Sequence, residues 1–196
     1  MSHFFAYLSR MRHIRRWSLM RNSLPENDLE HAGLTAILAH ALAVIRNDLA
    51  GSSGSEARVD PDRCATLALY HDVSEVITGD IATPIKYFNP GIAAAHREIE
   101  RAAQGKLLSM LPPPLAGRYR DIVQPDTSSE EWRVVKAADN LAAYLKCVEE
   151  LAVGNKEFLK ASQATLSKVM ALGMPEVDLF MREYAPSFGL ALDELN

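Results

Sequence analysis

The chain has 196 residues, a length typical of one domain, and its 48% hydrophobic and 23% charged residues are the ordinary balance of a globular protein. The formal net charge is −4, but the first 25 residues carry five arginines and no acid, which leaves the remainder at −9. An acidic body excludes a general binder of polymeric nucleic acid and allows a local anion site near the N-terminus. We therefore expect a single domain over residues 1–196.

Signals for membrane insertion and export are weak. The longest apolar stretch, from Ala32 to Ile45, is interrupted by two polar residues and is too short to span a bilayer, so we expect no membrane association. The arginine-rich, acid-free start resembles a transit peptide in composition, an alternative that the motifs below disfavour.

Cys64 and Cys147 lack CxxC spacing, which predicts two reduced core thiols in a cytoplasmic protein.

Helical periodicity runs through nearly the whole chain, whereas clean strand alternation is nearly absent. Prolines, glycines and capping residues mark the helix ends. The expected elements of the first half are a helix over 27–48, a loop over 51–54, a helix over 61–79 capped by Asp60, and a loop over 80–90. Those of the second half are helices over 90–111 and 115–122, one from a capping box at 128–131 to 154, and two over 157–172 and 175–184. The sequence predicts an all-α fold, a compact multi-helix bundle.

Five polar residues interrupt the apolar stripes of these helices: His31, His71, Asp72, Glu75 and Asp139. A buried, unpaired carboxylate costs several kcal/mol, so such acids must be exposed, paired or bound to a metal. Taken singly, each residue has a structural alternative, such as a hydrogen-bonded core histidine or an aspartate paired with an arginine of a neighbouring helix.

Taken together, the same residues indicate a metal site. Two imidazoles and two carboxylates suit a divalent transition metal such as Mn, Fe, Co or Zn. They come from three helices, which a bundle can bring to one point. Glu75 lies one turn after the His71-Asp72 pair, where a carboxylate can handle the proton of a metal-bound water without being a ligand.

The order His31, His71-Asp72, Asp139 resembles the HD-domain metal-dependent phosphohydrolases. A closer resemblance, to the bacterial YfbR-like 5′-deoxynucleotidases, covers nearly the whole chain. It is carried by HFFAYLSR (3–10), RRWSLMRN (15–22), ENDLEHA (26–32), LALYHDVSEVITGDIATPIKYFN (67–89), KAADNLAAYLKCVEELAVGN (136–155) and PSFGLALDE (186–194).

This resemblance implies a homodimeric HD-domain enzyme with one divalent metal ion. The enzyme would hydrolyse 2′-deoxyribonucleoside 5′-monophosphates to deoxynucleoside and phosphate by attack of a metal-bound water. The implied metal ligands are His31, His71, Asp72 and Asp139. The implied catalytic residues are Glu75 and Arg16. The implied substrate contacts are Arg16 with the phosphate, Trp17 with the sugar, the loop residues Asp80, Ile81, Ala82 and Thr83, and the ligands His31, Asp72 and Asp139.

Two segments depart from the family pattern. The family loop usually reads D-L-P-T-P, but this chain has Ala82 in place of the first proline, which predicts a looser loop. The usual S-E-H-S around the first ligand is replaced by residues 29–32, LEHA. Neither change removes a ligand. Over 112–128 the resemblance is poor, and no residue role is carried over.

Other functions stay open on the sequence alone. Another HD-domain nucleotide phosphohydrolase, a triphosphohydrolase or a phosphodiesterase, would share the ligands. A helical binding or scaffold protein could use the same histidines and aspartates as core hydrogen-bond partners. In that case Arg16 would be a solvated arginine and Trp17 a core aromatic residue.

Overall fold

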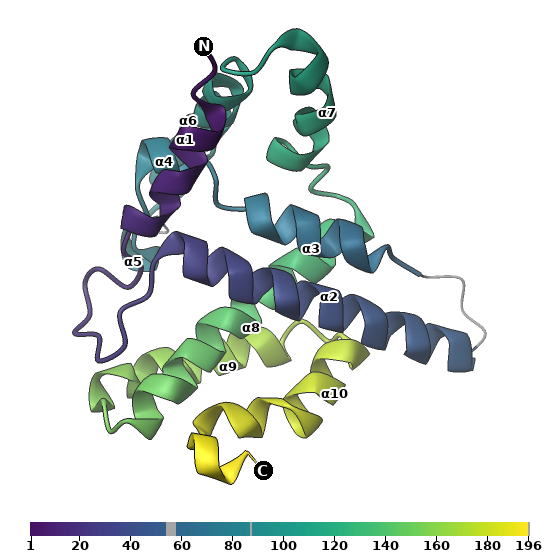
Figure 1. Cartoon of the computed structure of the whole chain (residues 1–196). Coiled ribbons are helices and arrows are strands. Elements are labelled where there is room, and N and C mark those ends of the chain that lie inside the picture. Colours follow the sequence, from purple (N-terminus) through teal and green to yellow (C-terminus); the bar gives the residue numbers. More distant parts are fainter. Residues whose placement is uncertain (54–57, 87, 196) are drawn as a thin grey trace.

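The computed structural model describes residues 1–53, 58–86 and 88–195. All regular elements within these ranges are helices (Figure 1), which confirms the all-α prediction. An isolated antiparallel bridge between Arg15 and Asn27 is the β feature found in them. The chain begins with two short elements that the sequence did not predict, α1 (Phe4–Leu8) and the 3-10 helix η1 (Ser9–His13). Phe4 and Met11 anchor them, because both side chains are buried.

The long helix α2 (Asp28–Ser53) begins where predicted and ends later than predicted. Asn27 Oδ1 caps it by accepting bonds from the backbone N–H groups of Leu29 and Glu30 at 3.0 and 3.1 Å. The expected end near residue 48 and the expected loop over 51–53 are wrong, and Gly54 lies outside the described residues. Asn47, just before the predicted end, exchanges two hydrogen bonds with the backbone of Val59 and so ties this part of α2 to the segment before the next helix.

By length and composition alone, α2 could cross a membrane over Asp28–Ser52. Half of that window is buried inside the protein, and α2 packs extensively on α3 (Pro61–Tyr70) and α8 (Glu130–Ala152). A central core helix has the same composition, so this feature is weak evidence for a membrane span.

The predicted single helix over 61–79 is wrong, because the structure divides it into α3 and α4 (Glu75–Thr78). Asp60 caps α3 as expected, accepting bonds from Asp62 N and Arg63 N. Between the two helices the backbone tightens to i→i+3 bonds, for example Glu75 N to Asp72 O at 2.9 Å. The tightened turn spans the His71-Asp72 pair, and Gly79 ends α4 with φ of +72°.

Three helices lie between α4 and α8 in the chain. The expected loop over 80–90 contains the short α5 (Thr83–Lys86), which is a correction. Asn89 caps α6 (Pro90–Leu108), which ends three residues earlier than expected. Helix α7 (Pro113–Val123) begins within the triple proline, because residues in the first turn of a helix need no backbone N–H partner.

The C-terminal half follows the prediction closely. The cap of α8 is Ser129 and not Ser128, which bonds to Asp126 instead. After Gly154 come η2 (Lys156–Phe158), α9 (Leu159–Met170) and α10 (Pro175–Glu183), with Gly154 and Gly173 at positive φ in the turns. Two 3-10 turns, η3 (Ala185–Gly189) and η4 (Leu192–Glu194), were not predicted.

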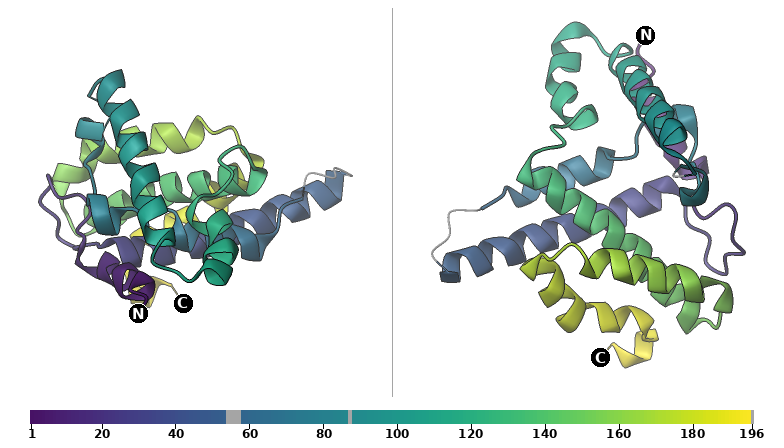
Figure 2. Two further views of the ribbon diagram at one scale, coloured as in Figure 1. Left: turned by 90° about the horizontal axis from the view of Figure 1, so that it is seen from above. Right: turned by 180° about the vertical axis from the view of Figure 1, so that it is seen from behind.

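The helices enclose two hydrophobic clusters. The larger one lies among α2, α3, α8, α9 and α10, and the smaller one joins α1 and η1 to the α6–α7 region. Figure 2 shows these two groups of helices from above and from behind. Ala32, beside His31, and Val73, beside Asp72, belong to the smaller cluster, whereas Ala138, beside Asp139, belongs to the larger one. The candidate site therefore lies where the two clusters meet. Both cysteines are buried and free, as predicted.

Candidate active site

The structure brings the four expected metal ligands together from three places in the chain. One nitrogen of His31, one of His71 and one oxygen of Asp139 all lie within 4.8 Å of one another. His31 Nε2 lies 3.1 Å from Asp139 Oδ1, and His71 Nε2 lies 3.0 Å from Asp72 Oδ2. Helix α2 supplies His31, the turn after α3 supplies His71 and Asp72, and α8 supplies Asp139.

The hydrogen bonds of His71 show that this group fits a cation. Its Nδ1 bonds to the carbonyl oxygen of Ala68 at 2.6 Å, so Nδ1 carries the proton and Nε2 faces the carboxylates. Nε2 is buried 3.0 Å from Asp72 Oδ2 and 3.7 Å from Asp139 Oδ1, but neither contact within the described residues has the geometry of a hydrogen bond. Although burial opposes the charged form, Asp72 and Asp139 raise the pKa of His71 to about 10. The site favours positive charge between its ligands, as a divalent metal would supply.

Arg16 lies beside these ligands on the segment that precedes α2. Its Nη1 is 3.0 Å from Asp72 Oδ2 and 3.5 Å from Asp28 Oδ1, and its Nε is 3.8 Å from Glu26 Oε2. Burial alone would lower the pKa of the guanidinium, but the surrounding carboxylates, Asp72 foremost, raise it above its ordinary value. Arg16 is therefore a permanent cation in the site, and its side chain is only 16% exposed, which excludes the solvated alternative.

Glu75 begins α4 and forms a carboxyl pair with Asp28, the first residue of α2. Burial, followed by the charges of Asp72 and Asp28, raises the pKa of Glu75 to about 11. Burial also raises the pKa of Asp28, to about 6. The side chain of Asp28 is fully buried, its Oδ1 lies 3.5 Å from Arg16 Nη1, and its carboxyl group shares a hydrogen bond with that of Glu75. Glu75 is thus a protonated carboxyl group next to the metal ligands.

Trp17 adopts a backbone conformation that a tryptophan rarely has. Its φ is +56°, and it is the only non-glycine residue at positive φ in the described ranges. Such a conformation costs on the order of 1–3 kcal/mol and is concentrated at functional sites. The indole Nε1 donates to Glu26 Oε2 at 3.2 Å, and the ring lies 5.4 Å from that of Phe158.

The expected substrate loop lies between α4 and α5. Asp80 is half-buried; burial raises its pKa, and its carboxyl group interacts electrostatically with Arg16 and Asp72. Ile81 and Ala82 are half-buried, whereas Thr83 is exposed and begins α5. The structure thus places Asp80 within electrostatic reach of Arg16 and Asp72.

Two acids of the site, Glu26 and Asp28, were missed by reasoning from the sequence. Both precede a helix or occupy its first turn, where acids are common because they favour the helix dipole. Because helix starts commonly carry acids, neither residue stood out as a site residue. The signal in the sequence that could have identified them is that both lie within five residues of His31.

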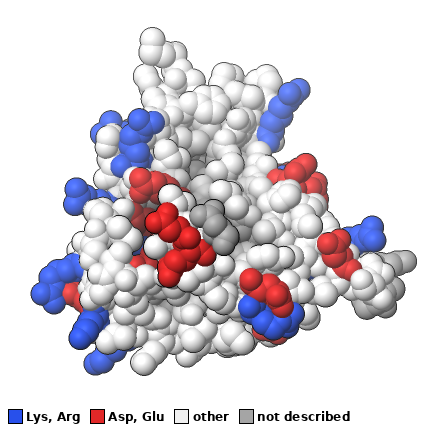
Figure 3. Space-filling view, turned by 60° about the horizontal axis from the view of Figure 1, so that its bottom comes forward, with Lys and Arg blue, Asp and Glu red and all other residues white. Residues whose placement is uncertain are grey.

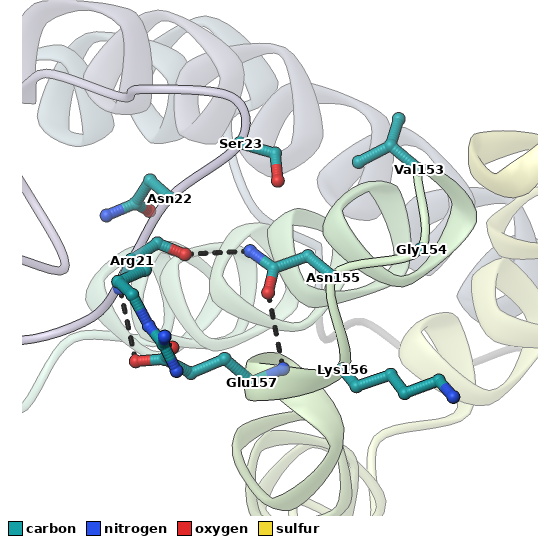
Figure 4. A pocket seen from close by; sticks show the side chains of 8 residues that line it. All are labelled: Arg21, Asn22, Ser23, Val153, Gly154, Asn155, Lys156 and Glu157. Carbon is teal, nitrogen blue, oxygen red and sulfur yellow. Dashed lines mark hydrogen bonds and ion pairs between the residues drawn. The ribbon is translucent and has the colours of Figure 1, made fainter.

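A surface pocket of about 650 Å³ lies beside the loop that carries Trp17 (Figure 4). It is lined by the segments 21–23 and 153–157 and contains none of the expected site residues. Asn22 connects it to the site, because its Nδ2 donates to the carbonyl oxygen of Trp17 at 3.2 Å.

On the face seen in Figure 3, acidic side chains gather near the middle and basic ones lie toward the edges.

Comparisons with known proteins agree with this geometry. Residues 3–188 match the family of YfbR-like 5′-deoxynucleotidases. The chain is similar to a 5′-deoxynucleotidase of Vibrio vulnificus, with 47% identity over 196 residues, covering 100% of this chain and 98% of that one. It is also similar to a 5′-deoxynucleotidase of Yersinia pestis, with 50% identity over 198 residues and the same coverage.

Two solved structures share the fold. An HD-domain phosphohydrolase of Listeria innocua superposes with a TM-score of 0.80 at 23% identity, covering 95% of this chain and 88% of that one. An HD phosphohydrolase of cyanophage S-2L, bound to dA and one catalytic Zn²⁺ ion, superposes with a TM-score of 0.61 at 19% identity, covering 93% and 95%. Both likenesses confirm that the bundle is of the HD-domain type.

Proposed function

The chain belongs to the YfbR-like 5′-deoxynucleotidases, and from this membership we propose how its site hydrolyses a 2′-deoxyribonucleoside 5′-monophosphate. The chain is a hydrolase of phosphomonoester bonds. The observation that carries the mechanism is that a permanent cation, a protonated carboxyl group and a mixed His/Asp ligand set lie side by side.

His31, His71, Asp72 and Asp139 would hold one divalent transition metal ion, with Co, Mn, Zn and Fe as candidates. When bound, the ion supplies Lewis-acid activation of the attacking water and neutralises charge on the phosphate. The bond from His71 Nδ1 to Ala68 O supports this role, because it leaves Nε2 as the ligand atom.

Arg16 would hold the phosphate group. Its guanidinium stays charged, and its buried Nε has no hydrogen-bond acceptor among the described residues. A planar N–H fork suits phosphate oxygens, and it can retain the group while charge shifts toward the leaving oxygen.

Glu75 would act as the general acid. The deoxynucleoside leaves with its O5′ oxygen, which must gain a proton when the P–O bond breaks. A carboxyl group whose pKa is raised to about 11 carries that proton at neutral pH. The water that attacks phosphorus supplies the oxygen of the released phosphate, and its proton can restore Glu75.

Trp17 and the loop residues Asp80, Ile81, Ala82 and Thr83 would surround the sugar. A site shaped around deoxyribose rejects a 2′-hydroxyl by crowding or by leaving a polar group unpaired. The strained backbone of Trp17 supports a role in recognition, since strain of this kind persists where a side chain must be held in one place.

A substrate panel tests this proposal against another HD-domain nucleotide phosphohydrolase. We expect phosphate release from dAMP with Mn²⁺ or Co²⁺, slower release from AMP, and no triphosphate from dGTP. Complete chelation should remove the activity and restored metal should return it. Undiminished activity after full metal removal would exclude the proposed metal role, and faster cleavage of dGTP than of dAMP would favour the triphosphohydrolase.

The assembly and location that we propose are a cytoplasmic homodimer acting on a small nucleotide rather than on polymeric nucleic acid or a membrane. Exposed apolar side chains on the outer face of α2, Ile37 and Val44, support a subunit contact there, because they lie two helical turns apart. Light scattering coupled to gel filtration checks the mass, and Ile37→Glu should shift it toward the monomer.

A further inference from the structure

We propose that Glu26 is a positioning residue that holds the metal ligand His31 and the sugar-facing Trp17 through the two oxygens of one carboxylate. The inference rests on the proposed function, because it assumes that His31 meets the metal and Trp17 meets the sugar. It assigns a role to a residue that lies outside the ligand set and outside the catalytic pair.

The first contact is with His31. Glu26 Oε1 lies 3.6 Å from Nδ1 of His31, the ring nitrogen opposite the one that faces Asp139. Nδ1 is buried and forms no hydrogen bond with any described residue. A metal-bound histidine ordinarily donates its other N–H to a carboxylate or carbonyl group, which fixes the ring and its tautomer. A shift of about 0.5 Å would bring the pair to hydrogen-bond length.

The second contact is with Trp17. The other oxygen, Oε2, accepts the indole N–H at 3.2 Å and lies 3.8 Å from Arg16 Nε. The carbonyl oxygen of Glu26 also accepts the backbone N–H of Arg16 at 3.1 Å. Glu26 therefore contacts Trp17 through its carboxylate, and Arg16 through both its carboxylate and its backbone carbonyl.

The strain at Trp17 is the independent observation that favours this role. A residue at φ of +56° returns to an ordinary conformation unless its surroundings prevent it. The carbonyl oxygen of Trp17 is held by Met20 N at 2.9 Å and by Asn22 Nδ2 at 3.2 Å, while Glu26 holds its side chain. Without Glu26 the backbone anchors remain, but the indole can rotate away from the site.

The chain offers variants that separate the two contacts. Glu26→Gln preserves the volume of the side chain and leaves only one oxygen acceptor. Trp17→Phe keeps an aromatic ring but removes the indole N–H donor together with the five-membered ring that carries it. Glu157→Gln is the matched control, because Glu157 binds Arg21 in the same segment of the chain at a distance from the ligands.

The first measurement is the dissociation constant of Mn²⁺ for the metal-free protein without substrate. We expect Glu26→Gln to weaken it about 10–100-fold, as is typical when the partner of a metal-binding histidine is removed. Trp17→Phe and Glu157→Gln should leave it within about twofold of the wild type, since neither touches His31.

The second measurement is the ratio of kcat/KM for dAMP to that for AMP. We expect Glu26→Gln and Trp17→Phe to lower this ratio, and Glu157→Gln to preserve it. Glu26→Asp, which retains the charge but is one methylene shorter, should show both losses and covers the case in which Glu26→Gln folds poorly.

Unchanged Mn²⁺ affinity in Glu26→Gln would overturn the proposal, and so would unchanged sugar selectivity, because one carboxylate is assigned both roles. If the wild-type protein itself fails to bind Mn²⁺, Co²⁺, Zn²⁺ or Fe²⁺, the proposed function fails instead. The two failures are therefore distinguishable.

Discussion

Helix α8 carries two acids that face the interior, the half-buried Asp139 and the fully buried Glu150, and their surroundings differ. Glu150 is fully satisfied. Its Oε1 accepts bonds from Leu24 N at 2.9 Å and Lys146 Nζ at 2.6 Å, and its Oε2 accepts bonds from Ser23 N at 2.9 Å and Asn155 Nδ2 at 2.7 Å. This cluster attaches the segment before α2 to the C-terminal half of α8.

Asp139 itself is paired, because its Oδ1 lies 3.1 Å from His31 Nε2 and its Oδ2 accepts a bond from Lys136 Nζ. The atoms without a hydrogen bond to the described residues belong to its neighbours, namely Nδ1 of His31 and Nε2 of His71, the latter 3.7 Å from Asp139 Oδ1. Buried polar atoms without partners cost free energy, so they persist where a ligand pairs with them. Complete pairing of the polar atoms around Glu150 therefore marks a structural cluster, whereas the unpaired ring nitrogens beside Asp139 mark a binding site. The following predictions test that distinction.

The largest effect is expected for Asp139→Asn. It removes a charged ligand, so turnover should fall to background. A metal that binds only the folded state at 100 times its Kd stabilises the wild type by about 2.7 kcal/mol, and this increment should vanish in the variant. Thermal unfolding with and without Mn²⁺ measures it. A variant that retains the full increment would show that the metal binds elsewhere.

Next in size is Glu75→Ala. The loss of a general acid should lower kcat by about 10²–10⁴-fold while the Mn²⁺ affinity stays close to that of the wild type. Single-turnover phosphate release and Mn²⁺ titration separate the two quantities. Equal losses in both would place Glu75 among the ligands rather than beside them.

A smaller effect, on stability alone, is expected for Glu150→Gln. Weakening a buried, paired carboxylate should lower the free energy of unfolding by about 3 kcal/mol, yet leave the metal-induced increment intact. Urea unfolding measures both. Glu149→Gln is the matched control, because burial raises the pKa of Glu149 and its charge therefore does not stabilise the fold. Similar losses in the two variants would contradict a special role for Glu150.

The smallest effect is the pH dependence of the difference in unfolding free energy between the wild type and Glu150→Gln. Burial opposes the charge of Glu150, but its hydrogen bonds, that of Lys146 foremost, lower its pKa from 4.5 to about 2. The folded state therefore gains stability from the ionised group above pH 4.5 and loses it as the pH falls toward 2. The gap in unfolding free energy between wild type and Glu150→Gln should narrow over that interval. A constant gap would mean that packing, not charge, is responsible.

Local sequence patterns predicted the helical class, most helix boundaries marked by Pro, Asn, Asp or Gly, and the polar residues that interrupt the apolar stripes of the helices. These features are local, because caps and periodicity depend on neighbouring residues. The resemblance carried the roles of Arg16, Trp17 and Glu75, which composition and spacing could not supply.

Three features depend on how distant segments pack and were not predicted: the break after α3, the carboxyl pair of Asp28 and Glu75, and the contacts of Glu26. The break exchanges regular helix bonds for a turn over the His71-Asp72 pair, which faces ligands from α2 and α8. Asp28 and Glu75 are 47 positions apart in the chain, so their pairing depends on the tertiary arrangement. Contacts between distant segments depend on packing, which no local pattern encodes.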